Sequence, residues 1–261
     1  MNSQSVNSLF GNAASDGAIG AGAVAVLTAP DLGAQIQAGL GVSVDDVSAS
    51  EVVLVTLLVD DSGSIDASGN EQTVRDGCNL VMQALASSKQ NDGILVSIRY
   101  LNGTVLTPFV PLDQAPVLDS QNYRATGGTP LYDQSVVALG GVIAKTQEFL
   151  DSGVGCRSVS LVVSDGADMH SRRNKAADVA KVVRDMRLTE SHIVAAMGIE
   201  DGCTDFRKVF GDMGVDAKWI LTPGDSPAEI RKAFQVFSQS AVRASQSAGS
   251  FSQAAGAGFT S

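Results

Sequence analysis

The chain has 261 residues, enough for one large α/β domain with additional segments at its ends, or for two small domains. Its 18 Lys and Arg residues against 28 Asp and Glu residues give a formal charge of −10. Because phosphate binding needs concentrated positive charge, this balance argues against nucleic acid as the main ligand.

The cysteines and the N-terminus favour a reducing compartment. Cys78, Cys156 and Cys203 lie far apart and without C-x-x-C spacing, which predicts reduced core residues rather than disulfides or a zinc site. No positively charged region opens the chain, and its most apolar early stretch, residues 18–27, is Gly-rich and too short to span a bilayer. We therefore predict a cytoplasmic protein.

The first fifty residues differ in composition from the rest. Residues 1–30 are rich in Ala, Gly, Ser and Asn and carry almost no charge. Leu32, Ile36 and Leu40 have helical spacing, which predicts a short amphipathic helix. We predict that residues 1–50 are an N-terminal extension that packs onto the main domain or onto another subunit.

The main domain is predicted to begin at Glu51. Residues 52–59 form an almost unbroken apolar, β-branched run, as expected of a central strand buried on both faces, and the run ends in DDSGS over residues 60–64. A helical pattern follows, with Val74, Cys78, Val81 and Leu85 on one face. Residues 94–101 and 104–110 then form a predicted hairpin around Asn102-Gly103.

The second half repeats the alternation of strand and helix. A Pro-rich loop leads to TGGTP over residues 126–130, and a helix follows with Leu131, Ser135, Leu139, Val142 and Phe149 on one side. Strands are predicted at 158–164, 192–198 and 217–221, and helices at 174–188, 204–213 and 227–244.

This order predicts an α/β domain over residues 51–244. Its sheet is doubly wound and mostly parallel, with helices on both faces and one antiparallel edge strand. Residues 245–261 are predicted to be a Ser/Ala/Gly-rich C-terminal tail in which Phe251 and Phe259 act as isolated anchors.

Oxygen-bearing side chains follow the predicted strands where ligands of such sheets gather. Asp60, Ser62 and Ser64 come directly after the first strand, Thr129 enters a helix, and Asp165 follows the strand at 158–164. Short carboxylate and hydroxyl side chains form a hard-oxygen site suited to Mg²⁺ or Mn²⁺. No His or Cys joins them, which argues against zinc.

These five residues resemble the metal-ion-dependent adhesion site (MIDAS) of von Willebrand factor A (VWA) domains. The pattern D-x-S-x-S over 60–64, the Thr at 129 and the Asp at 165 occur in the family's order, and the resemblance covers residues 51–243, of the prokaryotic intracellular type. It implies a VWA fold in which the two serines and the threonine ligate the ion directly or nearly so, and the aspartates act partly through water.

The resemblance also implies a function. An ion with one open coordination position would take an Asp or Glu carboxylate from a partner protein, so the chain is predicted to be a metal-dependent protein–protein interaction module and not an enzyme. By analogy, it would belong to a bacterial cytoplasmic assembly associated with an AAA+ ATPase, a stress system or a conflict system.

Five further residues are predicted to form a partner-binding rim around the ion: Asp61, Asp168, His170, Arg172 and Arg173. Four of the five also have an ordinary interpretation, since Asp61 suits a solvated turn, His170 an exposed loop, and the two arginines the surface charge at a helix entry. His192, at the start of a predicted strand, is expected to be structural.

Two alternatives remain open. The Gly/Ala-rich termini fit a structural or assembly subunit that associates with copies of itself or with neighbours and binds metal incidentally. Asp60-Asp61 at the end of a first strand also resembles metal-dependent phosphohydrolases of the haloacid dehalogenase type. Those enzymes need a second carboxylate two residues after the first, where this chain has Ser62.

Overall fold

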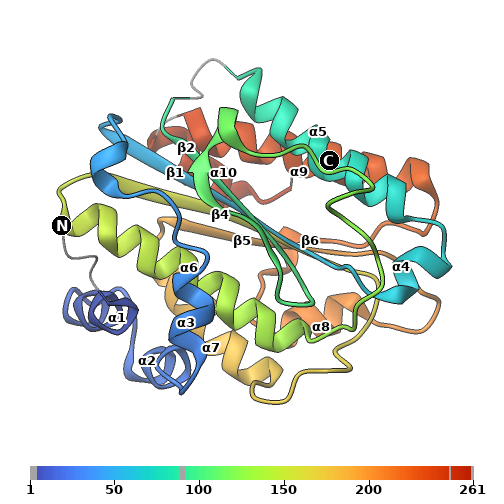
Figure 1. The fold of residues 1–261 in the computed structure, drawn as a ribbon, viewed down its shortest axis with the longest axis horizontal. Helices are drawn as coiled ribbons and strands as arrows, with labels where there is room; N and C mark the ends of the chain where they lie inside the picture. Colours follow the sequence, from blue (N-terminus) through green and yellow to red (C-terminus); the bar gives the residue numbers. More distant parts are fainter. Residues whose placement is uncertain (1–4, 89–91, 247, 260–261) are drawn as a thin grey trace.

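A computed structural model describes residues 5–88, 92–246 and 248–259. Its centre is a six-stranded sheet with the order β3-β2-β1-β4-β5-β6, in which β3 alone runs antiparallel to its neighbour. The predicted fold class, a mostly parallel sheet covered by helices with one antiparallel edge strand, is confirmed (Figure 1). The strands are β1 (Glu51–Val59), β2 (Ile94–Tyr100), β3 (Val105–Pro111), β4 (Gly155–Ser164), β5 (His192–Gly198) and β6 (Ile220–Leu221).

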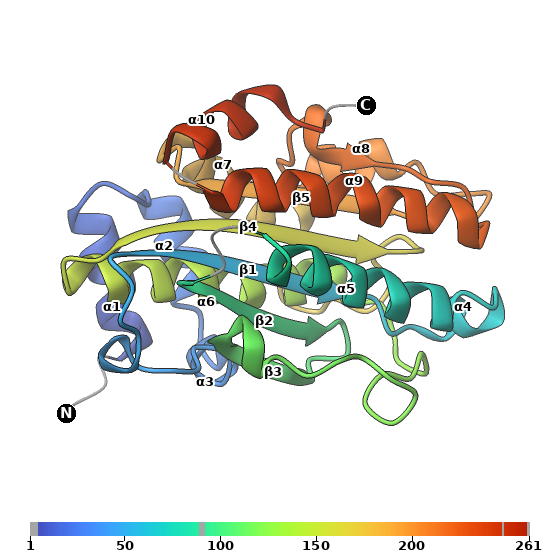
Figure 2. The same cartoon turned by 90° about the horizontal axis from the view of Figure 1, so that it is seen from above.

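The apolar composition of the central strands explains why they lie in the middle of the sheet. In β1 every residue after Glu51 is buried, because helices cover both sides of the sheet. One face carries α5 (Glu71–Ala86), α9 (Pro227–Gln246) and α10 (Ala248–Ala257), and the other carries α6 (Leu131–Asp151), α7 (Ala176–Leu188) and α8 (Phe206–Asp212) (Figures 1 and 2). A short helix, α4 (Gly63–Ala67), follows β1, and 3₁₀ turns occupy Val44–Asp46, Leu112–Gln114 and Ala217–Trp219.

The N-terminal segment forms three helices rather than one. These are α1 (Val6–Ser15), α2 (Ala21–Leu27) and α3 (Leu32–Gln37), and they lie against α6 and α7 (Figure 1). Phe10 and Leu27 are fully buried, and they join the same hydrophobic core as the sheet. The spacing of Leu32, Ile36 and Leu40 predicts α3 alone, but α1 has helical spacing as well, with its buried positions at Val6, Leu9, Phe10 and Ala13.

Polar contacts also fasten this segment to the sheet domain. The Asp185 carboxylate accepts the backbone N–H of Gly20 at 2.8 Å, at the start of α2. Residues 39–42 pair with the edge strand β3, where the N–H of Val42 donates to the Phe109 carbonyl at 2.9 Å. Gly41 has φ +66°, and a Cβ there would lie 1.9 Å from the Phe109 oxygen, so this crossing requires glycine.

In the C-terminal tail, residues 248–257 form helix α10. Phe251 is buried, and the Phe259 ring packs edge-on against Trp219 with ring centroids 4.9 Å apart. Both aromatic residues therefore contact the domain. Among the described helices, none combines the length and apolar character needed to cross a bilayer.

Candidate metal centre

The sheet brings two of the predicted loops together at its carboxyl edge. β1 and β4 are parallel neighbours, and the chain leaves them toward opposite halves of the sheet, so a crevice opens beyond their ends. Asp60 follows β1 and Asp165 follows β4. Their place in this crevice results from strand order.

Asp60 connects the two loops of the site through hydrogen bonds. Its Oδ1 accepts the N–H of Ser62 at 2.8 Å, and its Oδ2 accepts the hydroxyl of Ser164 at 2.6 Å and the N–H of Asp165 at 3.3 Å. The residue is 0% exposed. Asp60 therefore ties the loop after β1 to the end of β4, while its side chain faces no solvent.

Three oxygens from two loops form a compact triangle. The hydroxyls of Ser62 and Ser64 lie 2.9 Å apart, and they donate to Oδ1 of Asp165 at 3.2 Å and 2.7 Å respectively. Adjacent ligands of an octahedral Mg²⁺, at roughly 2.0–2.1 Å from the ion, lie about 2.9 Å apart. The spacing of the triangle therefore suits one face of such a coordination shell.

The Thr129 loop is hydrogen-bonded to both other loops. Gly127 bridges to Ser62, and the Gly127 carbonyl accepts the N–H of Gly63 at 3.1 Å. The Thr129 carbonyl accepts the N–H of Met169 at 3.1 Å, in the segment after Asp165. The three predicted segments thus converge, with Thr129 buried at 6% exposure between its neighbours.

The centre carries uncompensated negative charge. Asp60, Asp61 and Asp165 are all buried, and no Lys or Arg in the described residues forms an ion pair with them. Burial, with the nearby charge of Asp60 adding to it, raises the pKa of Asp165 to about 6, and the same two causes raise the pKa of Asp61 to about 6. A bound cation would offset the electrostatic cost of keeping these buried carboxylates ionised.

The donor set suits a hard cation. The described residues contain no cluster of three His, Cys, Asp or Glu side chains that could hold a metal, so an ion here would depend on hydroxyls as well as carboxylates. Oδ2 of Asp61 is buried and lacks a hydrogen-bond partner, which leaves one acceptor beside the site unused. Oxygen-only ligands of this kind favour Mg²⁺ or Mn²⁺.

Asp61 does not belong to the predicted rim. It is 1% exposed, and its Oδ1 accepts the N–H of Asn102 at 2.9 Å, in the β2–β3 turn. Burial by that turn keeps the Asp61 carboxylate away from any partner, so its assignment as a rim residue is corrected. No local sequence pattern signals a contact between residues 61 and 102.

The other rim candidates lie on the exposed segment after Asp165, but several are engaged. Asp168 accepts the N–H of Tyr132 at 3.1 Å, and the Arg173 guanidinium lies 3.5 Å from Asp31 of the N-terminal segment. His170 is exposed and accepts the N–H of Thr129 at 2.9 Å through Nδ1. Arg172 is exposed, as the prediction of a rim requires.

Asp133 has a role in the site that no sequence pattern predicts. From the first turn of α6, its carboxylate accepts the backbone N–H groups of Arg172 at 2.8 Å and Asn174 at 2.7 Å. In return, the Asp133 N–H donates to the Ser171 hydroxyl at 2.9 Å. These bonds fasten the segment after Asp165 to the helix that follows Thr129. An Asp in a first helical turn is too common to signal this role.

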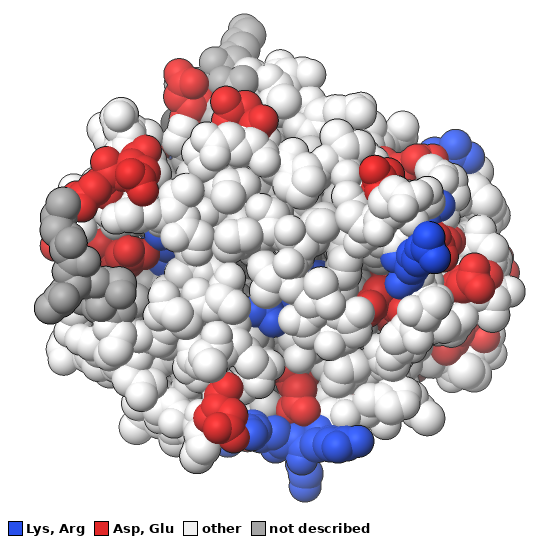
Figure 3. Space-filling model, viewed as in Figure 1, with Lys and Arg blue, Asp and Glu red and all other residues white. Residues whose placement is uncertain are grey.

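Charge on the surface agrees with the composition. On the face seen in Figure 1, charged side chains lie mainly toward the margins, and Lys and Arg lie in small groups beside Asp and Glu (Figure 3). The described part of this face therefore presents no basic stripe of the kind that follows a nucleic-acid backbone.

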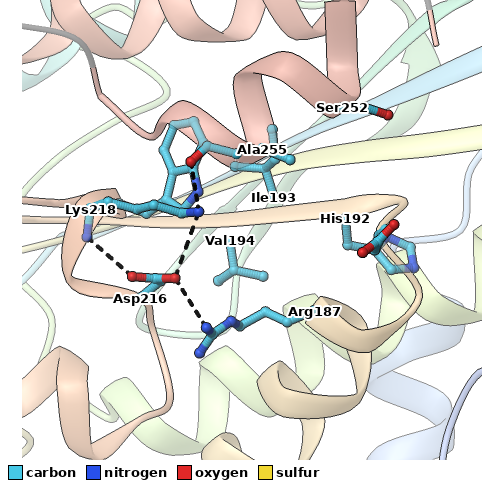
Figure 4. Close-up of a pocket in the computed structure, with 11 residues that line it drawn as sticks. Arg187, His192, Ile193, Val194, Asp216, Lys218, Ser252 and Ala255 are labelled. Atoms are coloured by element: carbon cyan, nitrogen blue, oxygen red, sulfur yellow. Dashed lines mark hydrogen bonds and ion pairs between the residues drawn. The ribbon is translucent and has the colours of Figure 1, made fainter. Parts of the chain in front are cut away.

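A separate cavity lies at the opposite end of β5 from the candidate centre. It has a volume of about 300 Å³ and is lined partly by Arg187, His192, Asp216 and Lys218 (Figure 4). Asp216 pairs with Arg187 at 3.0 Å and with Lys218 at 3.9 Å. The basic groups of this cavity thus already have an acidic partner.

His192 is buried beside this cavity, and its Nδ1 lies 2.7 Å from the Ser158 hydroxyl. Burial lowers the pKa of His192 from 6.5 to about 4. Because the unfolded chain then binds the proton more readily, stability should fall by up to about 3 kcal/mol as the pH drops from 7 to 4. Denaturant unfolding of the wild type and of His192→Asn between pH 7 and pH 4 tests this prediction. The free energy of unfolding should fall further in the wild type than in the variant. An equal fall in both proteins would contradict the lowered pKa of His192.

The cysteines follow their predicted state only in part. All three are free thiols, and Cys78 and Cys156 are buried, where burial raises the pKa of each thiol to about 12. Cys203 is exposed, which corrects its prediction as a core residue. It lies in a turn held by Asp201, whose carboxylate accepts the N–H groups of Cys203 and Thr204.

The fold agrees with the one that the resemblance to von Willebrand factor A domains predicts, and solved structures of low sequence identity share it. Similar solved structures include proximal thread matrix protein 1 from the mussel byssus (TM-score 0.53, 15% identity, 74% of this chain and 46% of that chain). A pilus adhesin, SpaC from Lactobacillus rhamnosus GG, has TM-score 0.54 and 12% identity over 74% of this chain and 31% of that chain.

A further form of the mussel protein is described as having a zinc-occupied MIDAS motif, and it matches with TM-score 0.50 and 15% identity over 73% of this chain and 46% of that one. The chain spans less than half the length of these solved chains. No family model and no curated protein matches the sequence. At these identities, the similarity establishes the fold.

Proposed function

We propose that this chain is a protein-interaction module that binds its partner through a divalent cation. The observation that carries the proposal is the triangle of the Ser62, Ser64 and Asp165 oxygens, 2.7–3.2 Å apart, at the switch point of the sheet. Thr129 and Asp60 complete the proposed set of five. The zinc-occupied MIDAS of the mussel protein supports a divalent ion at such a site.

The five residues would contribute to ion binding in two different ways. The hydroxyls of Ser62, Ser64 and Thr129 would supply neutral ligands in direct contact with the ion, while Asp60 and Asp165 would act partly through bound water. Because neutral ligands cancel none of the ion's charge, positive charge would remain at the open position. Bound Mg²⁺ or Mn²⁺ would there accept an Asp or Glu carboxylate of the partner.

Asp60 also speaks against the phosphohydrolase alternative. A nucleophilic aspartate must present a carboxylate oxygen to its substrate, but both oxygens of Asp60 accept hydrogen bonds from the protein and the residue is fully buried. We therefore propose a non-enzymatic role. The absence of a basic stripe on the face shown in Figure 3 supports a protein rather than a nucleic acid as partner.

The cellular setting is part of the proposal. Three free thiols favour a reducing compartment, and we place the module in a cytoplasmic multiprotein assembly of a bacterial cell. The alternative of a structural or assembly subunit is weakened, because the N-terminal helices pack against α6 and α7 of their own domain. Self-association through the termini would appear in light scattering of the full chain.

Affinity capture tests the proposal. Immobilised wild type should retain a partner in 2 mM Mg²⁺, a concentration on the order of that in cells, and lose it in EDTA, since the ion forms the contact. Thr129→Val, which removes only the proposed ligand hydroxyl, should also lose the partner, whereas Thr129→Ser should keep it. Equal retention in EDTA and in the Val variant would sink the metal-dependent mechanism.

A further inference from the structure

We propose that His170 is a positioning residue of the candidate metal centre, holding the Thr129 loop in register with the Asp165 loop. This inference rests on the proposed function of the site. Its first support is a hydrogen bond in which the Thr129 N–H donates to Nδ1 of His170 at 2.9 Å. A ring that accepts at Nδ1 carries its proton on Nε2, so the geometry assigns the tautomer.

The segment after Asp165 forms hydrogen bonds with both the backbone N–H and the backbone carbonyl of Thr129. While its N–H donates to the imidazole, its carbonyl accepts the backbone N–H groups of Met169 at 3.1 Å and His170 at 3.3 Å. His170 lies five residues after Asp165, on the segment that leaves β4. The main chain that carries the Thr129 hydroxyl is therefore fixed relative to the Asp165 carboxylate.

Gly128 gives a second, independent observation. A Cβ built on Gly128 would lie 2.8 Å from Nδ1 and 3.0 Å from Cγ of His170. The φ angle of Gly128 is not among the positive values, so the backbone itself would accept alanine. The imidazole is thus seated over the Gly128–Thr129 peptide, and residue 128 must be small because the ring occupies that space.

The contribution of His170 should be partial. Asp168 and Ser171 also bond to the start of α6, through the N–H groups of Tyr132 and Asp133, so the two loops stay connected without the imidazole. Groups that orient a metal ligand without touching the ion typically change affinity by about 10–100-fold. We expect an effect at the lower end of that range.

Substitutions at His170 test the inference with Mn²⁺ alone as the probe. Oδ1 of asparagine occupies the place of Nδ1, whereas glutamine extends past it and alanine has no acceptor. In titration calorimetry, Ala and Gln should weaken Mn²⁺ binding about tenfold, and Asn should restore it. By NMR hydrogen exchange without metal, the Thr129 amide should exchange faster in the Ala and Gln variants and slowly in Asn.

A second pair of variants tests the contact with Gly128. Gly128→Ala should weaken Mn²⁺ binding in the wild-type background, because the methyl group displaces the ring. In the His170→Ala background the same substitution should add little, since nothing remains to clash. Additive effects would show that the two residues do not interact, which overturns the inference.

The outcomes separate this inference from the proposed function. Wild type that binds no Mn²⁺ refutes the metal centre and the role of His170 with it. Wild type that binds Mn²⁺, with all three His170 variants binding equally well, refutes only the role of His170. Weakening in all three, accompanied by a lower unfolding midpoint, reveals a general structural role and refutes positioning as well.

Discussion

Divalent-ion affinity is expected to fall by more than about a hundredfold when Ser62 and Ser64 are both replaced by alanine. Residues that only orient a metal ligand change affinity by about 10–100-fold, and these two hydroxyls are the proposed ligands themselves. The fold should survive, because Asp60 accepts the backbone N–H of Ser62, which alanine retains. Titration calorimetry with Mg²⁺ and Mn²⁺ measures the loss, and thermal unfolding checks the fold.

A serine-to-alanine substitution elsewhere in the chain is the matched control, and it shows whether the loss of affinity is specific to the two serines of the site. Ser120 is exposed and lies in a loop outside the five proposed ligands, so Ser120→Ala should bind Mg²⁺ and Mn²⁺ as the wild type does. Zinc should be titrated in parallel, because the mussel protein with a similar fold is described with zinc in its MIDAS. Wild-type affinity in the double variant would remove the basis of the proposed function.

Phe10→Ala should destabilise the protein by about 3–5 kcal/mol, as is typical for a buried phenylalanine. Phe10 is 0% exposed in α1, which packs on α6, the helix that follows Thr129. Its removal leaves a cavity in the core shared by the N-terminal helices and the sheet domain. Urea denaturation measures the change in the free energy of unfolding.

The outcome decides how residues 1–50 relate to the domain. A loosely attached extension would make Phe10→Ala nearly neutral, with a change below about 0.5 kcal/mol, as for ordinary surface substitutions. Leu188→Ala is the matched control, because Leu188 is 75% exposed and its truncation should stay within that range. A small loss for Phe10→Ala would contradict the packing of α1 on α6.

The strands and long helices were predictable because their signals are local. The apolar run of residues 52–59 identifies a strand buried on both faces, and β1 occupies the centre of the sheet. The spacing of Val74, Cys78, Val81 and Leu85 marks the buried face of α5, where all four are buried. Periodicity of this kind depends on neighbours a few residues apart, which a sequence displays directly.

The terminal helices were not predictable in the same way. α1 and α10 are rich in Ala, Gly and Ser, and helices of only ten residues depend on packing for stability, even though the buried residues of α1 have helical spacing. Phe10 and Phe251 become core residues only because other elements cover them. Composition alone suggests a loose extension and a tail.

The candidate ligands were identified from the sequence because each follows a strand or enters a helix that could itself be recognised. In contrast, the roles of His170 and Asp133 depend on hydrogen bonds between segments about forty residues apart. The burial of Asp61 likewise depends on a turn at Asn102. No spacing in the chain encodes these contacts.

Hydrophobic periodicity and strand ends are local properties of the chain, so the doubly wound sheet and the five candidate ligands could be predicted from the amino-acid sequence. The folded chain adds three contacts: the Ser62, Ser64 and Asp165 oxygens lie within 3.2 Å of one another, Asp61 is enclosed, and His170 binds the Thr129 main chain. These contacts join separate loops, so their geometry exists only once the strands between the loops have paired.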